Sequence, residues 1–306
     1  MRSVSIKPEF SGKKIERVLL EIFPKLSTGV LYKSLRKKDI KINGVRIKEG
    51  HIVKSGDNLE VYIIDDFLYG INKPNVPMFN IVFEDDNLII VNKYPGISVH
   101  QDKHENGETL IDQVQDYLNS SNGNKVTASL CHRLDRNTGG LLIIAKNSQS
   151  LEVLEALIKD REITKLYKCI VYGQMPKVEA TLTHYLEKDD NQSRVFISEN
   201  RSPNSVEIVT KYKVISYDKN KNISRLEVEL ITGKTHQIRA HLAFIGHPLI
   251  GDGKYGTNVI NREFGIAKQQ LWAYKLIFNF NDGKHLNYLK DKAFEVTPTF
   301  SDKLLP

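Results

Sequence analysis

The order of the β-rich and helical segments constrains the fold of this chain more than any other feature. Two amphipathic helices are predicted at residues 109–119 and 148–161, and they interrupt the β-rich segments at irregular intervals. Parallel α/β sheets show a regular alternation of strands and helices instead. The β-rich segments are residues 81–83, 88–91, 141–146, 166–173, 206–217 and 223–231. This order predicts an α+β body with a mixed, largely antiparallel sheet.

The two predicted helices each carry one apolar face. Leu110, Val114 and Leu118 recur at helical spacing in the first helix. Ser148 stands at the start of the second helix and is predicted to cap it. The residues expected to face inward from that helix are Leu151, Leu154, Leu157 and Ile158.

The first 65 residues contain two shorter helices and a hairpin. Ser11 and Ser27 are predicted to cap the helices, and Pro24 ends the first of them. Asn43-Gly44 lies between alternating apolar residues, as in a two-residue hairpin turn. The predicted inward residues of the helices are Ile15, Val18, Leu19, Ile22, Val30, Leu31, Ser34 and Leu35.

Positive charge is concentrated in the same part of the chain. Residues 1–64 carry 14 Lys and Arg against 7 Asp and Glu, whereas the remaining residues carry 30 of each kind. The net charge of +7 therefore belongs to the first fifth of the chain. This asymmetry indicates a polyanion-binding module attached to a neutral body, although a lysine-rich solvated surface would give the same count.

This first segment resembles the αL RNA-binding motif, which occurs in ribosomal small-subunit protein four and in several RNA-modifying enzymes. The resemblance covers about residues 10–64 and implies a small α/β domain whose basic residues approach RNA phosphates. Those residues are Lys33, Arg36, Lys37, Lys38 and Lys41. The predicted division of the chain is a small domain at 1–65, a linker at 66–80 and a larger domain at 81–306.

The composition argues against several other classes of protein. No apolar stretch approaches the ~20 residues that span a bilayer. The first ten residues lack the apolar core of a secretory signal, so a cytoplasmic location is expected. Cys131 and Cys169 make no disulfide framework and are expected to be small buried side chains.

Three motif matches fail when their surroundings are considered. Residues 251–256 fit a dinucleotide-binding G-x-G-x-x-G pattern, but no clear strand precedes them and no clear helix follows. Residues 232–237 contain Gly-Lys-Thr without the earlier glycine of a phosphate-binding loop. His236, His241 and His247 lack a cysteine or carboxylate at zinc-ligand spacing. No metal and no nucleotide cofactor is therefore expected.

The segment 132–140, HRLDRNTGG, places one acid between two arginines. A neighbouring positive charge stabilises the carboxylate form, which a nucleophile or an electrostatic partner of a cationic transition state requires. The two glycines permit a close backbone approach or a positive φ. Asp135 is therefore a candidate catalytic residue. On the local sequence alone, the favoured interpretation is a turn residue that is hydrogen-bonded to its own backbone.

Two further segments place polar side chains among apolar ones. Arg239 has apolar neighbours and therefore needs an acidic partner, for which Asp135 and Asp252 are both candidates. Tyr167 lies on a predicted strand between two lysines. It is either part of a site or an ordinary half-buried strand aromatic.

Together these segments resemble the RluA-type family of pseudouridine synthases. Four motifs follow one another in the family's order over about residues 80–280: IVFEDDNLIIVNKYPGISVH, HRLDRNTGGLLIIAK, KLYKCIVYG and TGKTHQIRAHLAFIGHPLIGDGKYG. The resemblance implies the pseudouridine synthase fold, an RNA substrate, and neither a metal nor an organic cofactor.

The resemblance also implies roles for particular residues. Asp135 is the expected catalytic aspartate, Arg239 pairs with it, and Tyr167 stacks against the target base and serves in proton transfer. Arg133 extrudes the uridine or takes its place in the RNA stack, and His132 belongs to the scaffold of this base-flipping motif.

The chain departs from the family's pattern at two positions. Asn137 stands where the family often has Asp, and Lys234 stands where Arg is usual. Lys234 keeps a positive charge for RNA but loses the planar fork of arginine.

The expected activity is the isomerisation of specific uridines to pseudouridine, most of all in large-subunit ribosomal RNA, by a monomeric enzyme that flips the target base out. The N1–C1′ bond breaks, the uracil turns, and C5 joins C1′. The aspartate attacks the ribose, attacks the ring, or helps to remove a ribose proton, and the sequence favours none of these routes. The alternative is a non-catalytic RNA-binding or ribosome-assembly factor on the same fold.

Overall fold

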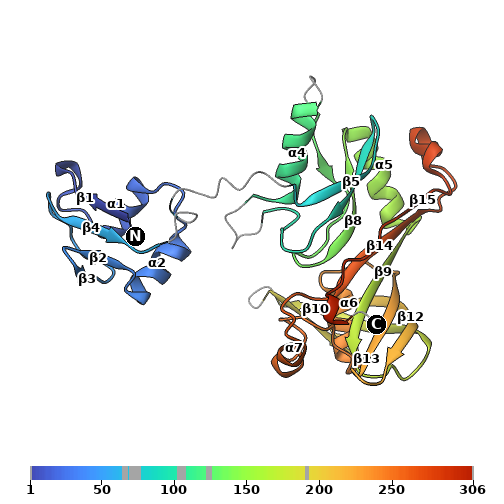
Figure 1. Cartoon of the computed structure of the whole chain (residues 1–306). Coiled ribbons are helices and arrows are strands. Elements are labelled where there is room, and N and C mark those ends of the chain that lie inside the picture. The colour runs from blue at the N-terminus through green and yellow to red at the C-terminus, as the bar shows by residue number, and fades with distance from the viewer. Residues whose placement is uncertain are drawn as a thin grey trace. The chain divides into compact units, whose positions relative to one another are not determined.

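The chain forms two compact units. The computed structural model describes residues 2–63, 68, 77–101, 108–121, 126–189 and 193–304. The units are Met1–Val76 and Pro77–Pro306, each with its own apolar core, and each is described by itself (Figure 1). Most of the predicted linker at 66–80 lies outside the described residues, and its last two residues, Phe79 and Asn80, belong to a strand.

The N-terminal unit packs two helices against a small antiparallel sheet. Its strands are β1 (Arg2–Ser5), β2 (Ile40–Ile42), β3 (Val45–Arg46) and β4 (Asn58–Val61). Their spatial order is β1-β4-β2-β3. The helices are α1 (Ile15–Ile22) and α2 (Thr28–Lys37). Leu19 of α1 and Leu35 of α2 are buried in one cluster with Leu59 of β4, which holds the helices on the sheet.

The local signals in this unit are mostly confirmed. The Ser27 hydroxyl accepts a hydrogen bond from the Val30 N–H at 3.3 Å and caps α2. Asn43 and Gly44 have φ of 50° and 79°, as a hairpin turn of this length requires. The cap predicted at Ser11 is wrong, because Ser11 ends a 3-10 turn and α1 begins only after Lys14, without a side-chain cap.

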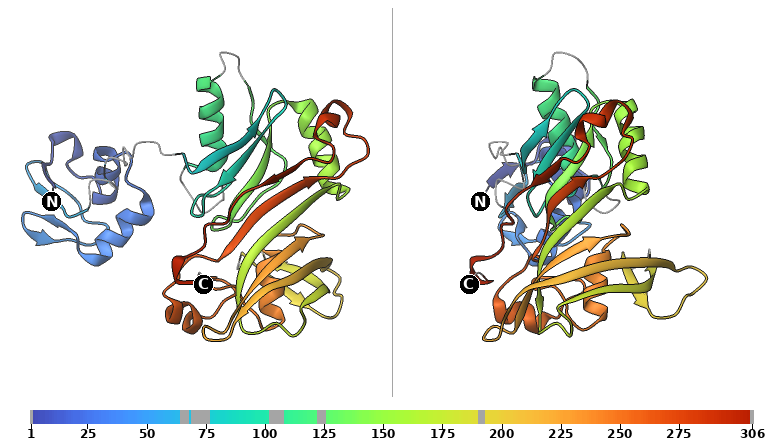
Figure 2. Two further views of the ribbon diagram at one scale, coloured as in Figure 1. Left: turned by 45° about the vertical axis from the view of Figure 1, so that its right-hand side comes forward. Right: turned by 90° about the vertical axis from the view of Figure 1, so that its right-hand side faces the viewer.

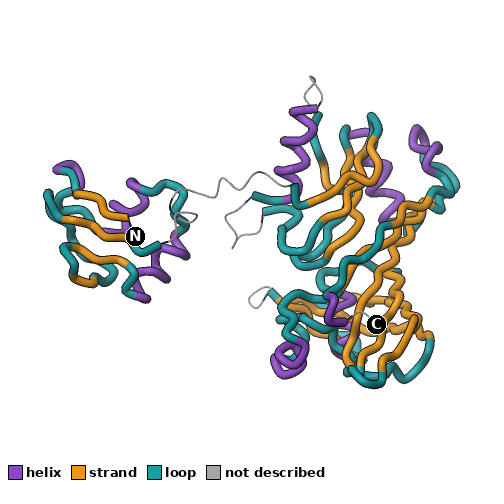
Figure 3. The backbone as a smooth tube through the Cα atoms, in the orientation of Figure 1, coloured by secondary structure: helices purple, strands orange, loops and turns teal. Residues whose placement is uncertain are grey.

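The second unit is built on one large sheet (Figure 3). Its strands are β5 (Phe79–Glu84), β6 (Leu88–Lys93), β7 (Ser129–Leu130), β8 (Gly139–Ala145), β9 (Ile163–Tyr172), β10 (Glu179–Asp189), β11 (Arg194–Ser198), β12 (Val206–Asp218), β13 (Ile223–Leu230), β14 (Leu271–Phe278) and β15 (Ala293–Glu295). The main order is β11-β10-β12-β13-β9-β14-β8-β6-β5. Among the pairs seen in the described residues, β8 with β14 is parallel and the others are antiparallel. The predicted α+β fold with a mixed, largely antiparallel sheet is confirmed.

Four helices accompany this sheet in the described part of the unit. They are α4 (Leu110–Ser121), α5 (Ser148–Lys159), α6 (Gln237–Phe244) and α7 (Asn258–Phe264). Short 3-10 turns add Pro8–Phe10 in the first unit, and Lys284–Leu289 and Asp302–Leu304 in the second. None of the helices that the structure describes has the length and apolar character needed to cross a membrane.

Strand β8 is apolar throughout because both of its faces are covered (Figure 2). Leu142 and Ile144 share an apolar cluster with Val114 of α4, whereas Leu141 and Ile143 belong to a separate cluster with Leu154 of α5. Successive strand residues point to opposite faces. The two helices therefore cover opposite faces of the sheet, and the strand that follows the Asp135 segment is held rigidly between them.

Two helix predictions need correction. Asn147, one residue before the predicted Ser148, caps α5 by accepting the Ser150 N–H at 2.8 Å. A helix does follow residues 251–256, because Thr257 accepts the Ile260 N–H and starts α7. α7 is short and buries none of its residues, so no apolar period in the sequence announces it.

Candidate active site

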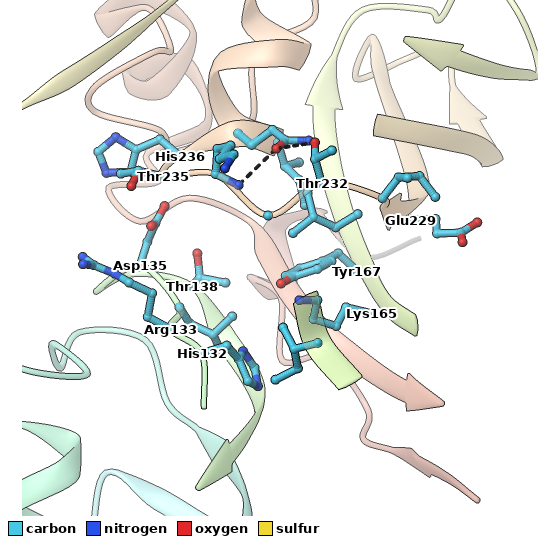
Figure 4. Close-up of a pocket in the computed structure, with 18 of the residues that line it drawn as sticks. His132, Arg133, Asp135, Thr138, Lys165, Tyr167, Glu229, Thr232, Thr235 and His236 are labelled. Carbon is cyan, nitrogen blue, oxygen red and sulfur yellow. Dashed lines mark hydrogen bonds between the residues drawn. The ribbon is translucent and has the colours of Figure 1, made fainter. Parts of the chain in front are cut away.

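A pocket of about 590 Å³ brings the three sequence segments together (Figure 4). The loop before β8 contributes Asp135, strand β9 contributes Tyr167, and α6 with the loop before it contributes His236 and Arg239. The first and last of these positions, Asp135 and Arg239, are 104 residues apart in the chain. The pocket therefore exists only because β14 holds β8 and β9 on its two sides.

Two glycines let the Asp135 loop enter β8 in close contact with β14. A Cβ placed at Gly139 would lie 2.5 Å from the Trp272 ring, and one at Gly140 would lie 2.1 Å from the Ala273 carbonyl oxygen. Gly140 also has φ of +115°, which side chains disfavour. The close approach predicted for the Gly-Gly pair is thus a contact with the β14 backbone and an indole ring.

A buried lysine holds the same loop through hydrogen bonds to backbone carbonyl groups. Nζ of Lys93 donates to the carbonyl oxygens of Tyr94, Ile97 and Arg136 at 2.9–3.1 Å. Burial lowers the pKa of Lys93 to about 7, and the nearby Asp135 charge opposes that shift. Lys93 lies within the first of the four family motifs, but its contacts could not be predicted from the sequence because its partners are backbone groups.

Arg239 joins two carboxylates. Its Nη1 donates to Oδ2 of Asp135 at 2.8 Å, while Nε and Nη2 form a fork on Asp252 at 2.7 and 3.0 Å. Both partners considered from the sequence are therefore present at once. Burial alone would raise the pKa of Asp252, but the hydrogen-bonded guanidinium outweighs it and keeps that pKa below its usual value. The Asp252 side chain is fully buried, whereas that of Asp135 is 20% exposed toward the pocket.

Tyr167 forms the wall of the pocket on β9. Its side chain is buried, and its ring lies across the pocket from Asp135 (Figure 4). Burial, and then the Asp135 charge, raise the pKa of the phenol, so the hydroxyl stays protonated near neutral pH. A neutral ring with one proton can both stack on a base and take part in a proton transfer.

His236 and Tyr255 lie around the guanidinium of Arg239. Nδ1 of His236 is 2.9 Å from the Tyr255 hydroxyl, and the Arg239 guanidinium lies 5.3 Å from the centre of the Tyr255 ring. Burial lowers the pKa of His236 to about 4, so the imidazole is neutral at pH 7. The sequence argues against His236 as a zinc ligand and does not single out Tyr255.

The other predicted residues of the large unit lie at the loop and the rim. Nε2 of His132 accepts the Ile143 N–H at 3.1 Å and fastens the loop to β8, as a scaffold residue would. Arg133 is exposed, with Nη1 at 3.2 Å from Nε2 of His100. Lys234 is exposed and lines the mouth of the same pocket.

The five predicted phosphate-contacting residues of the N-terminal unit lie in the second half of α2, at its C-cap and on β2. Four of them are exposed: Lys33, Arg36, Lys37 and Lys38. Lys41 is half-buried, and its Nζ lies 4.8 Å from the centre of the Tyr62 ring. The structure groups these cations on one unit.

The structure offers no metal centre in the part of the chain that it describes. No group of three or more His, Cys, Asp and Glu side chains could hold an ion there. Cys131 and Cys169 are both buried, and they form no disulfide bond with each other. Burial raises the pKa of the Cys131 thiol to about 12. Neither thiol is suited to bind a metal or to attack a substrate.

Comparison with known proteins bears on the family of the chain. The family described as RNA pseudouridylate synthase matches residues 87–244. A ribosomal large subunit pseudouridine synthase C of Rickettsia felis is 31% identical over 263 residues, covering 81% of this chain and 83% of the relative. A ribosomal large subunit pseudouridine synthase D of Buchnera aphidicola is 31% identical over 277 residues, covering 86% and 85%.

A solved structure shares the fold. The human RNA pseudouridylate synthase domain containing 4 superposes with a TM-score of 0.58 over 72% of this chain and 88% of the human one, at 23% identity. With the sequence matches, this places the chain in one class: it belongs to the RluA-type family of RNA pseudouridine synthases. The protein is therefore an isomerase that acts on uridine in RNA. Membership of this family favours the catalytic interpretation of the sequence over the non-catalytic RNA-binding one.

Proposed function

We propose that the protein modifies uridines of large-subunit ribosomal RNA, with Asp135 as the catalytic carboxylate. The observation that carries the proposal is the Asp135–Arg239 ion pair at the edge of a pocket walled by Tyr167. The names of the relatives from Rickettsia felis and Buchnera aphidicola support the choice of RNA.

We propose one task for each side of the pocket. Arg239 engages Oδ2 of Asp135, and among the described residues no hydrogen bond engages Oδ1. That oxygen is therefore available to the target nucleotide, whether it attacks the ribose, attacks the ring or accepts a ribose proton. Tyr167 stacks on the flipped base, keeping it in place while the N1–C1′ bond breaks and C5 turns toward C1′. A closed wall of this kind keeps the detached base away from water.

The remaining predicted residues serve the RNA around the target. Arg133 is exposed at the pocket mouth, where a guanidinium can fill the gap that the flipped uridine leaves. Unstacking the uridine costs a few kcal/mol, which such an inserted side chain offsets in part. Lys234 binds a phosphate at the rim. Residues 1–65 form an RNA-binding domain, and the catalytic domain begins with the second unit at Pro77 rather than at residue 81.

The test measures tritium release from RNA labelled at C5 of uridine, because forming the C5–C1′ bond expels that hydrogen. We expect release from transcribed large-subunit ribosomal RNA and not from small-subunit ribosomal RNA or transfer RNA. Mapping pseudouridines in cells with and without the protein would identify the uridine. Release from transfer RNA alone would refute the choice of substrate.

A further inference from the structure

One of the basic side chains that line the pocket, Lys165, takes no part in the two ion pairs of Arg239. Lys165 lies two residues before Tyr167 on β9, so both point to the same face of the strand. Figure 4 shows its side chain beside the Tyr167 ring, across the pocket from Asp135. Its ammonium also lies near the loop before α6, since a Cβ placed at Gly233 would stand 3.8 Å from Nζ.

Lys165 is half-buried without an acidic partner. Among the described residues, neither a hydrogen bond nor an ion pair engages its Nζ, and burial lowers the pKa of Lys165 with no carboxylate opposing the shift. A desolvated ammonium without an anion is costly. Such a group in a cleft indicates a ligand that supplies the missing negative charge.

The other basic side chains lining the pocket do not share this situation. Arg239 is buried but neutralised by Asp135 and Asp252. Four others are exposed and can be hydrated: Arg133, Lys159, Arg161 and Lys234. Among the described lysines and arginines that line the pocket, Lys165 is thus the half-buried one that has no negatively charged partner.

We infer that Lys165 is a catalytic residue that donates a hydrogen bond to a carbonyl oxygen of the uracil ring held on Tyr167 and stabilises the negative charge that the ring acquires during the reaction. The inference deepens the proposed function and rests on it. Lys165 and Asp135 stand on opposite sides of the pocket, so a nucleotide with its ribose at Asp135 extends its base toward Lys165 (Figure 4).

The chemistry requires such a group whichever route Asp135 follows. When the N1–C1′ bond breaks, its electron pair remains on the ring and is shared among N1, O2 and O4. When the carboxylate instead adds to the ring, the displaced electrons again collect on a carbonyl oxygen. A fixed donor that meets this charge acts mainly in the transition state and raises kcat rather than affinity.

The test compares Lys165→Met in the full-length protein with the native enzyme on transcribed large-subunit ribosomal RNA. We expect kcat for tritium release to fall on the order of 100-fold, as when one donor of an oxyanion site is removed. KM, RNA affinity and the salt dependence of affinity should stay unchanged. Lys165→Arg keeps a charged donor and should retain more activity than Lys165→Met.

Thermal melting separates this role from a structural one. Removing an unpaired, half-buried charge should leave the melting temperature of Lys165→Met unchanged or raise it. The matched control is Lys168→Met on the same strand, whose Nζ lies over the Tyr274 ring at 4.3 Å on the opposite face. This control should keep the native kcat.

Several results would overturn the inference. They are an unchanged kcat for Lys165→Met, equal losses for the Met and Arg variants, or a lost activity that follows a lowered melting temperature. Weaker RNA binding with a shallower salt slope would show a phosphate contact instead and would also refute it. If the native enzyme releases no tritium from any RNA, the proposed function itself fails, which is a different outcome.

Discussion

At the scale of single residues, one guanidinium shared by two carboxylates fixes the charge and the orientation of the candidate site. Arg239 neutralises the fully buried Asp252 and at the same time orients Asp135, which faces the pocket. The two acids look alike in the sequence, yet their tasks differ because only one of them is accessible. The inner carboxylate holds the arginine in place, and the outer one is the carboxylate that we propose contacts the substrate.

Replacement of Asp135 by Asn should abolish turnover and leave RNA binding nearly intact. The amide keeps the size of the side chain but cannot act as a carboxylate. Tritium release and filter binding measure the two properties separately. Asp116→Asn, at an exposed position on α4, is the matched control and should be fully active. Near-native activity of Asp135→Asn would refute the assignment.

Replacement of Arg239 by Met should destabilise the protein by about 3–5 kcal/mol, because it leaves the Asp252 charge buried and unpaired. Adding Asp252→Asn removes that charge and should recover much of the loss without restoring activity. Urea unfolding and tritium release measure the two effects. Equal stability of the single and double variants would contradict this account of the ion pair.

Two partly or fully desolvated histidines, the half-buried His236 and the buried His241, should make the fold sensitive to mild acid. The ordinary pKa of 6.5 is lowered to about 4 in both His236 and His241, mainly by burial. Below pH 6.5 the unfolded chain therefore binds protons that the folded protein refuses, so stability is full above pH 6.5 and falls between pH 6.5 and 4.

Between pH 6.5 and 4, each of these histidines lowers the free energy of unfolding by at most about 1.4 kcal/mol per pH unit. Urea unfolding at pH 7, 6 and 5 should show the decline above the range where most carboxylates titrate. His241→Gln should reduce the slope. An unfolding free energy that is the same at pH 7 and pH 5 would refute this prediction.

At the scale of elements, the Asp135 loop depends on how closely β8 approaches β14. The parallel pair places Gly139 beside Trp272 and Gly140 beside Ala273. Lys93 holds the other side of the loop through three carbonyl groups. The position of Asp135 is therefore set by backbone packing on both sides of its loop.

Gly140→Ala should destabilise the protein and reduce kcat together. Its methyl group would lie 2.1 Å from a carbonyl oxygen and 2.6 Å from a backbone nitrogen of Ala273, so β8 and β14 must separate. The matched control is Gly29→Ala on α2, where no atom lies within 4 Å. There, the better helix former should be neutral or stabilise by up to about 1 kcal/mol. Equal melting temperatures for the two variants would contradict the close-contact explanation.

Elements whose signals are local could be predicted from the sequence, and those whose position depends on distant partners could not. The Ser27 cap, the Asn43-Gly44 turn and the apolar face of α4 follow from neighbouring residues. β10 mixes exposed and half-buried positions and shows no clean apolar run. The insertion of β14 between β8 and β9 depends on pairing between segments far apart in the chain.

The site divides in the same way. Asp135, Tyr167 and Arg239 stand out by type within recognisable motifs. Lys93 and Tyr255 do not, since the tasks of both come from groups brought to them by folding: three carbonyls for the lysine, and a guanidinium for the tyrosine ring.

At the scale of the whole molecule, charge and chemistry belong to different units. The N-terminal unit carries the excess of positive charge, whereas the pocket lies in the second unit. Affinity for RNA should therefore depend on one unit and turnover on the other.

Neutralising the N-terminal cations should weaken RNA binding and flatten its salt dependence. The variant changes four exposed residues to Gln: Lys33, Arg36, Lys37 and Lys38. For every phosphate that the variant no longer neutralises, the slope of log affinity against log salt should become shallower by about 0.7–0.9. The control changes four exposed lysines of the second unit: Lys177, Lys219, Lys284 and Lys290. Identical salt slopes for both variants would show that the charge asymmetry has no role in binding.

The place of β14 has a consequence for the synthesis of the protein. This strand, at Leu271–Phe278, is made after both β8 and β9, yet it lies between them in the middle of the sheet. Until it is made, the two halves of the sheet have no shared strand, and Asp135 and Tyr167 belong to separate halves. Contacts so distant in sequence form late and slowly. A nascent chain therefore cannot assemble the pocket before β14 has left the ribosome.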